Sequence, residues 1–459
     1  MPLSNTIRLS SICVLITTIV GCAPHSQTNY EDNIEQSLNT LKSWSHEKQV
    51  DAEKVTTITE LMSIPELNQL VEHAMQNNPS LQQTGLALQI AYAQKRETGA
   101  EQLPSAELNF GASKGEDEDD SFTSELSVSW EIDIWQKVAD SKAAASASIL
   151  SAAADYQAAK DTLAADIMRQ WLKISMYQQF VAIEKDRLKS LKNNELFVLE
   201  RYRKGLGELE DLDSALTSSE SAQATIADYE QSLDSARLSL KILLGELGEA
   251  VLPTVPSTFP QVILPLTDLP SQDLSRRPDL RSAFADIQAQ QYTTQVAYKD
   301  MLPSLSLTAA LNDSSTNLSD SLLVSPLWSL LGQISAPLFQ GGKLKAAAEI
   351  EELNTEKTFW VYQETLLTAV NEVEEALSQE HALYLQQHHL NLSLASVLRS
   401  ESNYQDKYRK GLVDVLDFLS VQQQTYDTKI QLVQTTHDRL SNRIDLGLAL
   451  GLGVINESK

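Results

Sequence analysis

Five residues occur twice in this chain, because Tyr202-Arg203-Lys204-Gly205-Leu206 recurs as Tyr408-Arg409-Lys410-Gly411-Leu412, 206 positions further on. Each copy follows a long stretch with little or no proline or glycine, and a glycine just past such a stretch is typical of a helix end. The repeated segment therefore predicts two tight turns, with Gly205 and Gly411 letting one helix reverse into the next.

Other landmarks repeat in the same order. Asn78-Pro79-Ser80-Leu81 is matched by Arg277-Pro278-Asp279-Leu280 at an offset of 199, and Leu244-Gly245 by Leu450-Gly451 at 206. The change of offset places a seven-residue insertion in the polar loop around 312–321 of the second copy. Repeats with one order indicate an internal duplication. We expect a first repeat over 61–250, a linker over 251–270 and a second repeat over 271–459.

Two very long helices are predicted in front of the repeated turns. Residues 137–203 contain neither proline nor glycine, which corresponds to a helix of about 100 Å. Ile167, Ile174, Val181 and Leu188 lie seven residues apart, as in a coiled-coil seam, and Val370, Leu377 and Tyr384 repeat this spacing. Helices of this length fit the wall of a tunnel better than a globular domain.

Each repeat also predicts two β-strands, because apolar and polar residues alternate before each long helix. Such a strand fits a position between lipid and water, and a soluble sandwich strand gives the same pattern. The pore-lining polar face would carry Ser127, Ser129 and Glu131. The apolar positions are Leu108, Phe110, Ala112, Leu126, Val128, Trp130 and Ile132 in the first repeat, and Leu305, Leu307, Ala309, Leu311, Ile334, Ala336 and Leu338 in the second.

Four strands cannot close a barrel by themselves, and in a bilayer every backbone group must be paired. Several chains must therefore share one barrel, and three chains would give twelve strands. We expect a mainly α-helical fold with membrane β-structure: a trimeric, 12-stranded β-barrel and a long α-helical periplasmic barrel.

The N-terminus is typical of a cleaved bacterial lipoprotein signal. Arg8 precedes a short apolar run that ends at Gly21-Cys22, a layout too short for a stable membrane-spanning helix. Ile19-Val20-Gly21-Cys22 resembles a lipobox, which predicts a signal peptide over 1–21 and N-acyl and S-diacylglycerol groups on Cys22. Ala23 favours sorting to the outer membrane, and residues 22–60 would form an acylated segment with equatorial contacts. An ordinary signal with an incidental cysteine is the alternative.

Composition and motifs exclude several functions. The 459-residue chain has a formal charge of −26, which argues against nucleic-acid binding. No P-loop, His-Glu-x-x-His or Gly-x-Ser-x-Gly motif occurs, so we predict no enzymatic activity and no cofactor. His381, His388 and His389 share a helix without the further ligands that a metal site needs. We therefore predict no metal site.

These segments together resemble the TolC-like outer-membrane efflux proteins, in particular the acylated OprM/CusC (NodT-type) branch that works with resistance-nodulation-division (RND) pumps. The residues that carry the resemblance are Trp130-Glu131-Ile132-Asp133-Ile134-Trp135, Arg276-Arg277-Pro278-Asp279-Leu280, Pro337-Leu338-Phe339-Gln340-Gly341-Gly342-Lys343 and the two Tyr-Arg-Lys-Gly turns.

The resemblance implies a homotrimer in the outer membrane of a Gram-negative bacterium, lipid-anchored and extending into the periplasm. Tyr202, Gly205, Tyr408 and Gly411 would lie at the periplasmic tips and contact an adaptor (a membrane fusion protein). An inner-membrane RND pump would supply the energy. A mixed belt around the helices would use residues near 30–60, the joint 253–270 and the C-terminus.

The resemblance also places a periplasmic gate after the second turn. The apolar constriction falls on Leu416 and an acidic position on Asp417, and a further family aspartate is replaced here by Ser420. Three serines on a threefold axis would hydrogen-bond without attracting cations as three aspartates do. The alternative is structural: Leu416 packs in a seam, and Asp417 is an acidic residue at a helix N-terminus.

We predict that the chain is the exit duct of a tripartite efflux system that exports small molecules, drugs or metal ions. One alternative is the outer-membrane channel of a type I protein-secretion system, which has the same fold. Another is a structural envelope lipoprotein that does not conduct, against which the four amphipathic strands count. The acidic run 116–120 lies between the first two strands and is expected to be a solvated outer loop.

Overall fold

The computed structural model describes residues 30–40, 43–44, 52–116, 119–246, 254–268 and 270–454. The chain divides into two units. The first, residues 1–42, contains helix α2 (Tyr30–Thr40). The second, residues 43–459, contains the other described elements, and all that follows concerns this unit. Among the described residues, no helix is both long and apolar enough to cross a membrane.

The second unit contains the same order of elements twice. The corresponding helices match closely in length, except that α3 has 13 residues and α7 has 7. The paired helices α4 and α8 have 22 residues each, and α5 and α9 have 67 each. The first series is α3 (Pro65–Asn77), α4 (Pro79–Ala100), β2 (Ser105–Ser113), β3 (Ser121–Ile132), α5 (Lys137–Arg203) and α6 (Leu209–Leu244); the second is α7 (Pro270–Arg276), α8 (Pro278–Lys299), β5 (Ser304–Ser315), β6 (Leu327–Ser335), α9 (Lys343–Arg409) and α10 (Val415–Ala449).

The long helices have the bounds that the absence of proline and glycine predicted. α5 begins at Lys137 and ends at Arg203, and α9 ends at the equivalent Arg409. Gly205 and Gly411 follow with φ of +71° and +72°, a left-handed conformation that glycine adopts without strain. Leu206 N donates to the Arg201 carbonyl at 2.9 Å, which closes the first turn.

The four longer strands form one antiparallel sheet in the order β2-β3-β5-β6. The strand predicted to continue through Ala336 and Leu338 ends instead at Ser335. Pro337 explains the difference, because proline lacks the N–H group that a strand donates to its neighbour. A 3-10 turn, η2 (Leu318–Asp320), lies in the β5–β6 connection, where the insertion was predicted.

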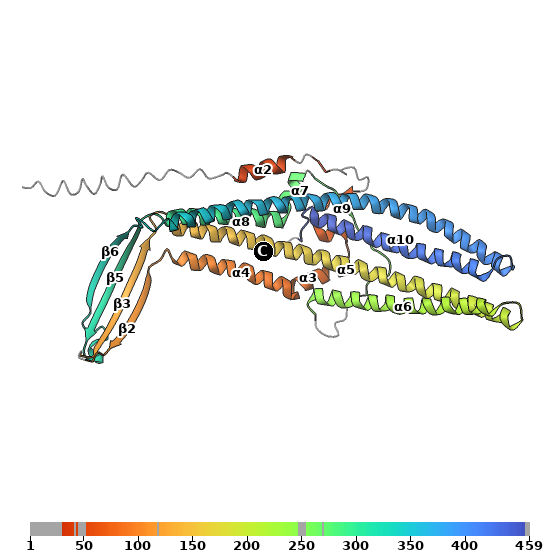
Figure 1. The fold of residues 1–459 in the computed structure, drawn as a ribbon, viewed down its shortest axis with the longest axis horizontal. Helices are drawn as coiled ribbons and strands as arrows, with labels where there is room; N and C mark the ends of the chain where they lie inside the picture. The colour runs from red at the N-terminus through yellow and green to blue at the C-terminus, as the bar shows by residue number, and fades with distance from the viewer. Residues whose placement is uncertain are drawn as a thin grey trace, which may run out of the picture. The chain divides into compact units, whose positions relative to one another are not determined.

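The helices pack as neighbours in a row, with α4 on α5, α5 on α8, and α8 on α9. α6 folds back along α5, and α10 folds back along α9. Within this unit the sheet lies at one end of the helices, and the two turns, α5–α6 and α9–α10, lie at the other (Figure 1). The chain thus connects a sheet to two helix tips through helices of about 100 Å.

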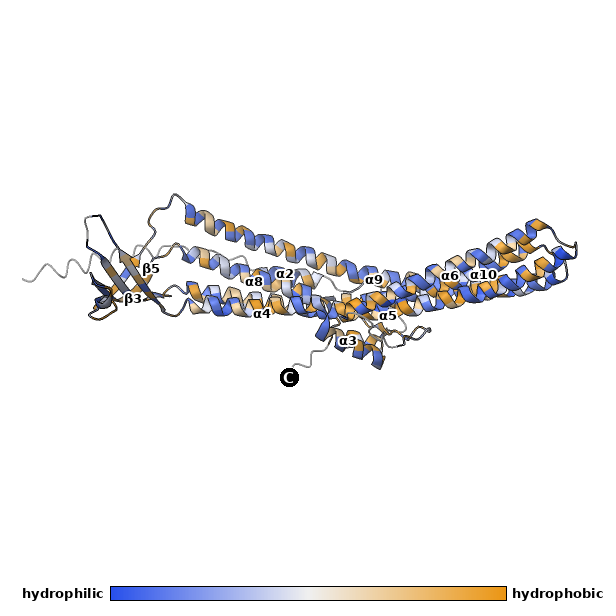
Figure 2. Ribbon diagram, turned by 90° about the horizontal axis from the view of Figure 1, so that it is seen from below, coloured by the Kyte–Doolittle hydropathy of each residue, from blue (hydrophilic) through white to orange (hydrophobic). Residues whose placement is uncertain are grey.

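The main hydrophobic core lies midway along α5. Ile167, Met168 and Leu172 of α5 are fully buried there, together with residues of α3, α6 and α10. Apolar residues are correspondingly dense where α3 meets α5 (Figure 2). The predicted belt contributes to this core through Ile58 and Leu61 of η1 (Ile58–Leu61), Val255 and Val262 of the linker, and Leu452 near the C-terminus. β1 (Ala52–Glu53) pairs in parallel with β4 (Leu264–Pro265) beside it.

Near this core, the same kind of contact occurs once in each repeat, between the start of a short helix and the end of a hairpin. Asn78, the N-cap of α4, accepts a hydrogen bond from Leu81 N and donates to the Leu243 carbonyl at the end of α6. Arg277 precedes α8 in the same way and donates to the Ala449 carbonyl at the end of α10. Each short helix is therefore bound to the end of the hairpin in its own half.

Candidate channel wall, helix tips and gate

The register of the sheet separates its side chains into an apolar and a polar face. Leu108, Leu126, Leu311 and Trp328 lie opposite one another on successive strands, so that their side chains share one face. The same face carries Ala106, Phe110, Val128, Trp130, Ile132, Leu305, Leu307, Ala309, Leu330 and Ile334. The sequence prediction of alternating faces is confirmed up to Ser335.

This apolar face is open. Trp328 is 78 % exposed, Ile334 74 %, and Leu108 and Leu330 67 % each. Soluble proteins rarely expose so extended an apolar surface. The strands have 9 to 12 residues, and about 9–11 residues are needed to cross a bilayer as a tilted β-strand. The face therefore suits contact with lipid.

The opposite face is mainly polar. The register places Ser127 opposite Glu107 and Ala310, Ser129 opposite Ser105 and Thr308, and Glu131 opposite Ser306. The residues predicted to line a pore thus share one face, on the side away from the apolar residues. That they line a pore stays a prediction.

Cross-repeat contacts hold the junction between the sheet and the helices. Lys137 Nζ at the start of α5 lies 3.0 Å from Asp300 Oδ1 at the end of α8. Lys299 pairs with Asp140 close by, and Trp135 Nε1 donates to the Pro303 carbonyl at 2.6 Å. The hydrogen bond to Pro303 gives Trp135, at the end of the Trp130–Trp135 segment, a structural role. The indole of Trp130 donates to the Gln102 carbonyl at 3.0 Å.

The two helix tips carry the same turn sequence but differ in packing. Tyr202 is 42 % exposed, whereas Tyr408 is 4 % exposed. The Tyr408 ring stacks on Phe418 and meets the Phe197 ring edge-on, with 5.4 Å between centroids in each case. Burial is the main cause that raises the pKa of Tyr408, and the nearby Arg201 charge opposes it. Phe197 belongs to α5, so this aromatic cluster joins the second hairpin to the first.

The three predicted gate residues lie in the first turns of α10 and point away from the chain's own core. Leu416 is 52 % exposed, and Asp417 and Ser420 are also exposed. Val415 and Phe418 occupy the buried side of the same turns. Leu416 is therefore not packed within its own chain. Whether Leu416, Asp417 and Ser420 close a gate stays a prediction.

Asp417 also has a local structural environment. Its backbone N–H donates to the side chain of Asp414, the N-cap of α10, at 2.8 Å. The carboxylate of Asp417 itself stands in the first turn, where negative charge is favourable at a helix N-terminus. Glu208, the N-cap of α6, makes no such side-chain bond. The second tip is thus more firmly capped than the first.

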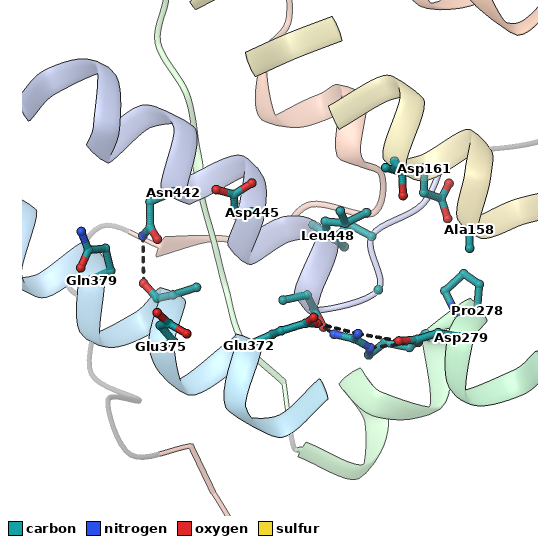
Figure 3. Close-up of a pocket in the computed structure, with 16 residues that line it drawn as sticks. Ala158, Asp161, Pro278, Asp279, Glu372, Glu375, Gln379, Asn442, Asp445 and Leu448 are labelled. Carbon is teal, nitrogen blue, oxygen red and sulfur yellow. Dashed lines mark hydrogen bonds and ion pairs between the residues drawn. The ribbon is translucent and has the colours of Figure 1, made fainter. Parts of the chain in front are cut away.

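A cavity of about 530 Å³ lies between α5, α8, α9 and α10 (Figure 3). Its lining includes Arg277 and five carboxylates: Asp161, Asp279, Glu372, Glu375 and Asp445. Burial raises the pKa of Asp161 to about 6, and hydrogen bonds from Val454 N and Gln157 partly offset this effect. The cavity is thus acidic and lies at the level of the belt.

Arg277 is the buried ion-pairing centre of this cavity. It is 6 % exposed, and Nη2 lies 2.7 Å from both Asp279 Oδ2 and Glu372 Oε2. Nη1 donates to the Ala449 carbonyl at 2.9 Å. One side chain therefore connects α8, α9 and the end of α10, which gives the Arg276–Leu280 motif a structural role that its sequence alone did not show.

Two other sets of predictions concern ligands. No group of three or more potential metal-ligating side chains occurs in the part of the chain that the structure describes. His388 and His389 lie beside each other on α9, with ring centroids 5.4 Å apart. Cys22 lies outside the described residues, and its acylation stays a prediction.

An open apolar sheet face, a polar opposite face and helices of about 100 Å define a subunit of a membrane channel with a long helical extension. The outer membrane efflux protein family model matches residues 70–246 and 269–452. The chain belongs to this family. It is an outer-membrane protein, the exit duct of a tripartite efflux system, in a family of channel proteins.

Curated relatives and solved structures agree with this assignment. The chain is 27 % identical to the cation efflux system protein CusC of Escherichia coli O6:H1, over 84 % of this chain and 85 % of CusC. It is 26 % identical to the pyoverdine export outer membrane protein OpmQ of Pseudomonas aeruginosa, over 88 % of each chain. The fold matches the Campylobacter jejuni CmeC outer membrane channel with a TM-score of 0.82 and 23 % identity, over 92 % and 93 % of the two chains.

Proposed function

We propose that three copies of this chain form a gated duct through which small molecules leave the cell. The observation that carries the proposal is the sheet: its apolar face is exposed over all four strands, and its outer strands are β2 and β6. In a bilayer the outer edges of these strands need partners. β6 of one copy and β2 of the next supply them, and three copies close a barrel of twelve strands.

The helices would continue the duct into the periplasm. The row α4-α5-α8-α9 occupies one third of a ring, and the hairpins α5–α6 and α9–α10 extend to its tips. Exposed apolar residues at both tips support contact with an adaptor: Leu206 is 65 % exposed and Leu412 69 %. Tyr202, Gly205, Tyr408 and Gly411 belong to the same two turns. An inner-membrane RND pump would drive export through that adaptor.

The gate would lie on the axis between the three second hairpins. The exposure of Leu416, Asp417 and Ser420 supports this placement, because an apolar residue that its own chain leaves open is available to equivalent residues of two partners. Three Leu416 side chains would form the constriction. Three Asp417 carboxylates would repel one another and favour cations.

The proposed substrate class is broad, because the relatives are named for different small substrates. CusC is named for cation efflux and OpmQ for pyoverdine export, and the two are almost equally similar to this chain. The described residues contain no metal-ligating cluster, so a duct of this kind would take its selectivity from the pump and adaptor. We propose small molecules, drugs or metal ions, as the exported class.

The lipid anchor completes the proposal. Acylation of Cys22 would fix the mature N-terminus in the outer membrane, since each buried CH₂ of an acyl chain contributes about 0.8 kcal/mol. Mass spectrometry of the mature N-terminal peptide tests this directly. A Cys22→Ser variant that remained in the outer membrane and lost no mass would contradict it.

The experiment that tests the function is growth of a deletion strain on dyes, detergents, antibiotics, copper, silver and zinc. Sensitivity of the deletion strain to unrelated organic compounds would identify a multidrug duct, provided that the parent gene restores resistance. Sensitivity to metals alone would identify a metal-efflux duct. Unchanged growth on every compound would contradict efflux, and loss of a secreted protein in that strain would favour the type I secretion alternative.

A further inference from the structure

Charged residues alternate in sign where the strands meet the helices. Lys137, the first residue of α5, forms its ion pair with Asp300, the C-cap of α8. The hydrogen bond to Asp300 is the main cause that raises the pKa of Lys137; burial opposes it, and the charges of Asp300, Glu131 and Glu101 add to it. Glu101 is the C-cap of α4. Lys137 is therefore near acidic residues of both neighbouring helices.

The repeat reproduces these charges. The offset of 199 that relates α4 to α8 carries Glu101 onto Asp300, and the offset of 206 that relates α5 to α9 carries Lys137 onto Lys343. Lys343 is the first residue of α9, as Lys137 is of α5. Acidic residues thus end both short helices, and lysines begin both long ones.

The internal contact between α5 and α8 shows which helix faces are involved. Ser151 Oγ of α5 lies 3.0 Å from Ser282 Oγ of α8. One turn to either side of Ser151 on the same face, Ala147 and Ala154 are 5 % and 7 % exposed. On α8, Ala285 lies one turn beyond Ser282 and is 3 % exposed.

The equivalent faces of α9 and α4 carry exposed apolar residues on either side of a polar position, because Lys357 and Gln83 stand where α5 and α8 have Ser151 and Ser282. Ala147 and Ala154 correspond to Leu353 and Trp360 of α9, which are 58 % and 62 % exposed. Ala285 corresponds to Leu86 of α4, which is 54 % exposed, and Ile90 on the next turn is 57 % exposed. The faces that cover each other between α5 and α8 are thus present on α9 and α4, and both are open in a single chain.

In the ring of three copies proposed above, α9 lies beside α4 of the partner subunit as α5 lies beside α8. We infer that Lys343 pairs there with Glu101 of the partner subunit. Glu101, Lys137, Asp300 and Lys343 of three copies then form a closed ring of alternating charges at the junction of strands and helices. The inference rests on the trimer proposed above. Its partner is a second copy of this chain, and its position follows from the open strand edges and the repeat.

The ring would be weaker between subunits than within them. The second internal ion pair, Lys299 with Asp140, corresponds to Ala100 and Ala346. Each subunit boundary therefore has one ion pair, with small apolar residues in place of the other. Leu86, Ile90, Leu353 and Trp360 would supply apolar contact instead.

Cross-linking tests the contact. A Glu101→Cys, Lys343→Cys double variant of the full chain is treated in detergent with a short bis-maleimide, because ion-paired side chains place their Cα atoms too far apart for a disulfide. We expect covalent dimers and trimers on denaturing gels. The single variants, the parent chain and Glu101→Cys with Lys345→Cys, where position 345 is also exposed but on another side of α9, should remain monomeric on the gel.

The native mass of the same samples separates the possible failures. A trimeric mass without covalent trimers in the double variant would overturn the Lys343–Glu101 contact and leave the proposed trimer standing. A monomeric mass would overturn both. Covalent trimers formed equally well through Lys345→Cys would also contradict the contact, because they would show non-specific labelling.

Charge inversion gives a second readout that needs no cysteine. The Lys343→Glu variant should dissociate from trimer to monomer at a lower temperature than the parent, because a carboxylate at this position would face acidic residues on both sides. Inverting all four positions, with Glu101→Lys, Lys137→Glu, Asp300→Lys and Lys343→Glu together, restores the alternation and should recover most of the loss. A fourfold variant that dissociates more easily than the single one would contradict the ring.

Discussion

The ring of Tyr408 lies flat on the ring of Phe418, with centroids 5.4 Å apart and an angle of 6° between their planes. Tyr408 lies in the last turn of α9 and Phe418 in the first turn of the returning helix α10, so the stack closes the second tip. Phe197 of α5 completes the cluster from the first hairpin. The equivalent Tyr202 in the first tip is exposed. The tyrosine of the second tip is therefore held in an aromatic cluster that reaches across to α5, whereas the tyrosine of the first tip is exposed.

Phe418→Ala should loosen the second tip. Removing a buried aromatic side chain costs about 3–5 kcal/mol of local packing, and here it also frees Tyr408 from α10. We expect resting conductance in planar bilayers to rise. The matched control is Leu212→Ala at the equivalent position of α6, where no aromatic stack is lost. Equal increases in the two variants would show that the aromatic cluster does not hold the tip.

The gate prediction compares the two tips directly. Leu416→Ala with Asp417→Ala should raise resting conductance more than Glu210→Ala with Asp211→Ala, which changes the equivalent positions after the first turn. The reason is that the first pair would remove an apolar constriction on the axis, and the second pair would not. Single-channel recording measures the conductance of both variants. Equal increases would contradict a gate formed after the second turn alone.

Asp161 makes stability depend on pH. Its pKa rises from 3.8 to about 6 in the folded chain, so the folded state binds the proton more tightly than the unfolded state. Stability is then greatest below about pH 4 with respect to this group and falls as pH rises through 6, by up to about 3 kcal/mol.

Asp161→Asn should remove that loss while keeping an oxygen that accepts from Val454 N. We expect the variant to melt at a higher temperature than the parent at pH 7.5 and at nearly the same temperature at pH 4, measured by differential scanning calorimetry. Asp155→Asn, at an exposed position on the same helix, is the control. If Asp161→Asn raised the melting temperature equally at both pH values, the cause would not be the buried, ionised carboxylate of Asp161.

The glycines of the turns should differ in their tolerance of a side chain. Gly411→Ala meets no atom within 4 Å, so its cost is limited to the left-handed backbone, about 1–2 kcal/mol. Gly245→Ala has a similar φ of +71°, but its Cβ would lie 2.2 Å from the Asn77 carbonyl oxygen. Thermal unfolding should therefore show a much larger loss for Gly245→Ala. Similar losses would mean that the α6 end can move away from α3.

The sequence predicted those parts of the fold that depend on local pattern. The bounds of α5 followed from a run without proline or glycine, and the two sheet faces from strict alternation of apolar residues such as Leu126 and Val128. Where a local pattern and local chemistry disagreed, the chemistry decided. Ile334, Ala336 and Leu338 alternate like a strand, but Pro337 cannot donate a hydrogen bond, and β6 ends at Ser335.

The parts that sequence reasoning missed depend on distant partners. Tyr202 and Tyr408 are followed by the same four residues, and they differ in packing because Phe418 is aromatic where the first repeat has Leu212. Arg277 was identified as part of a motif, but Glu372, one of its partners, lies 95 residues away. A signal did exist: the Asn78–Leu243 and Arg277–Ala449 contacts are related by the repeat offsets, which an aligned comparison of the two halves could have found.

The most direct test of the account is conductance of the purified, trimeric protein in planar bilayers, with the parent compared with Leu416→Ala, Asp417→Ala. We predict small or infrequent openings for the parent and discrete, larger conductance steps for the double variant. The preference for cations should be weaker in the double variant, because it lacks the Asp417 carboxylates. Insertion of trimers without conductance in either protein would contradict a duct and favour a structural envelope lipoprotein.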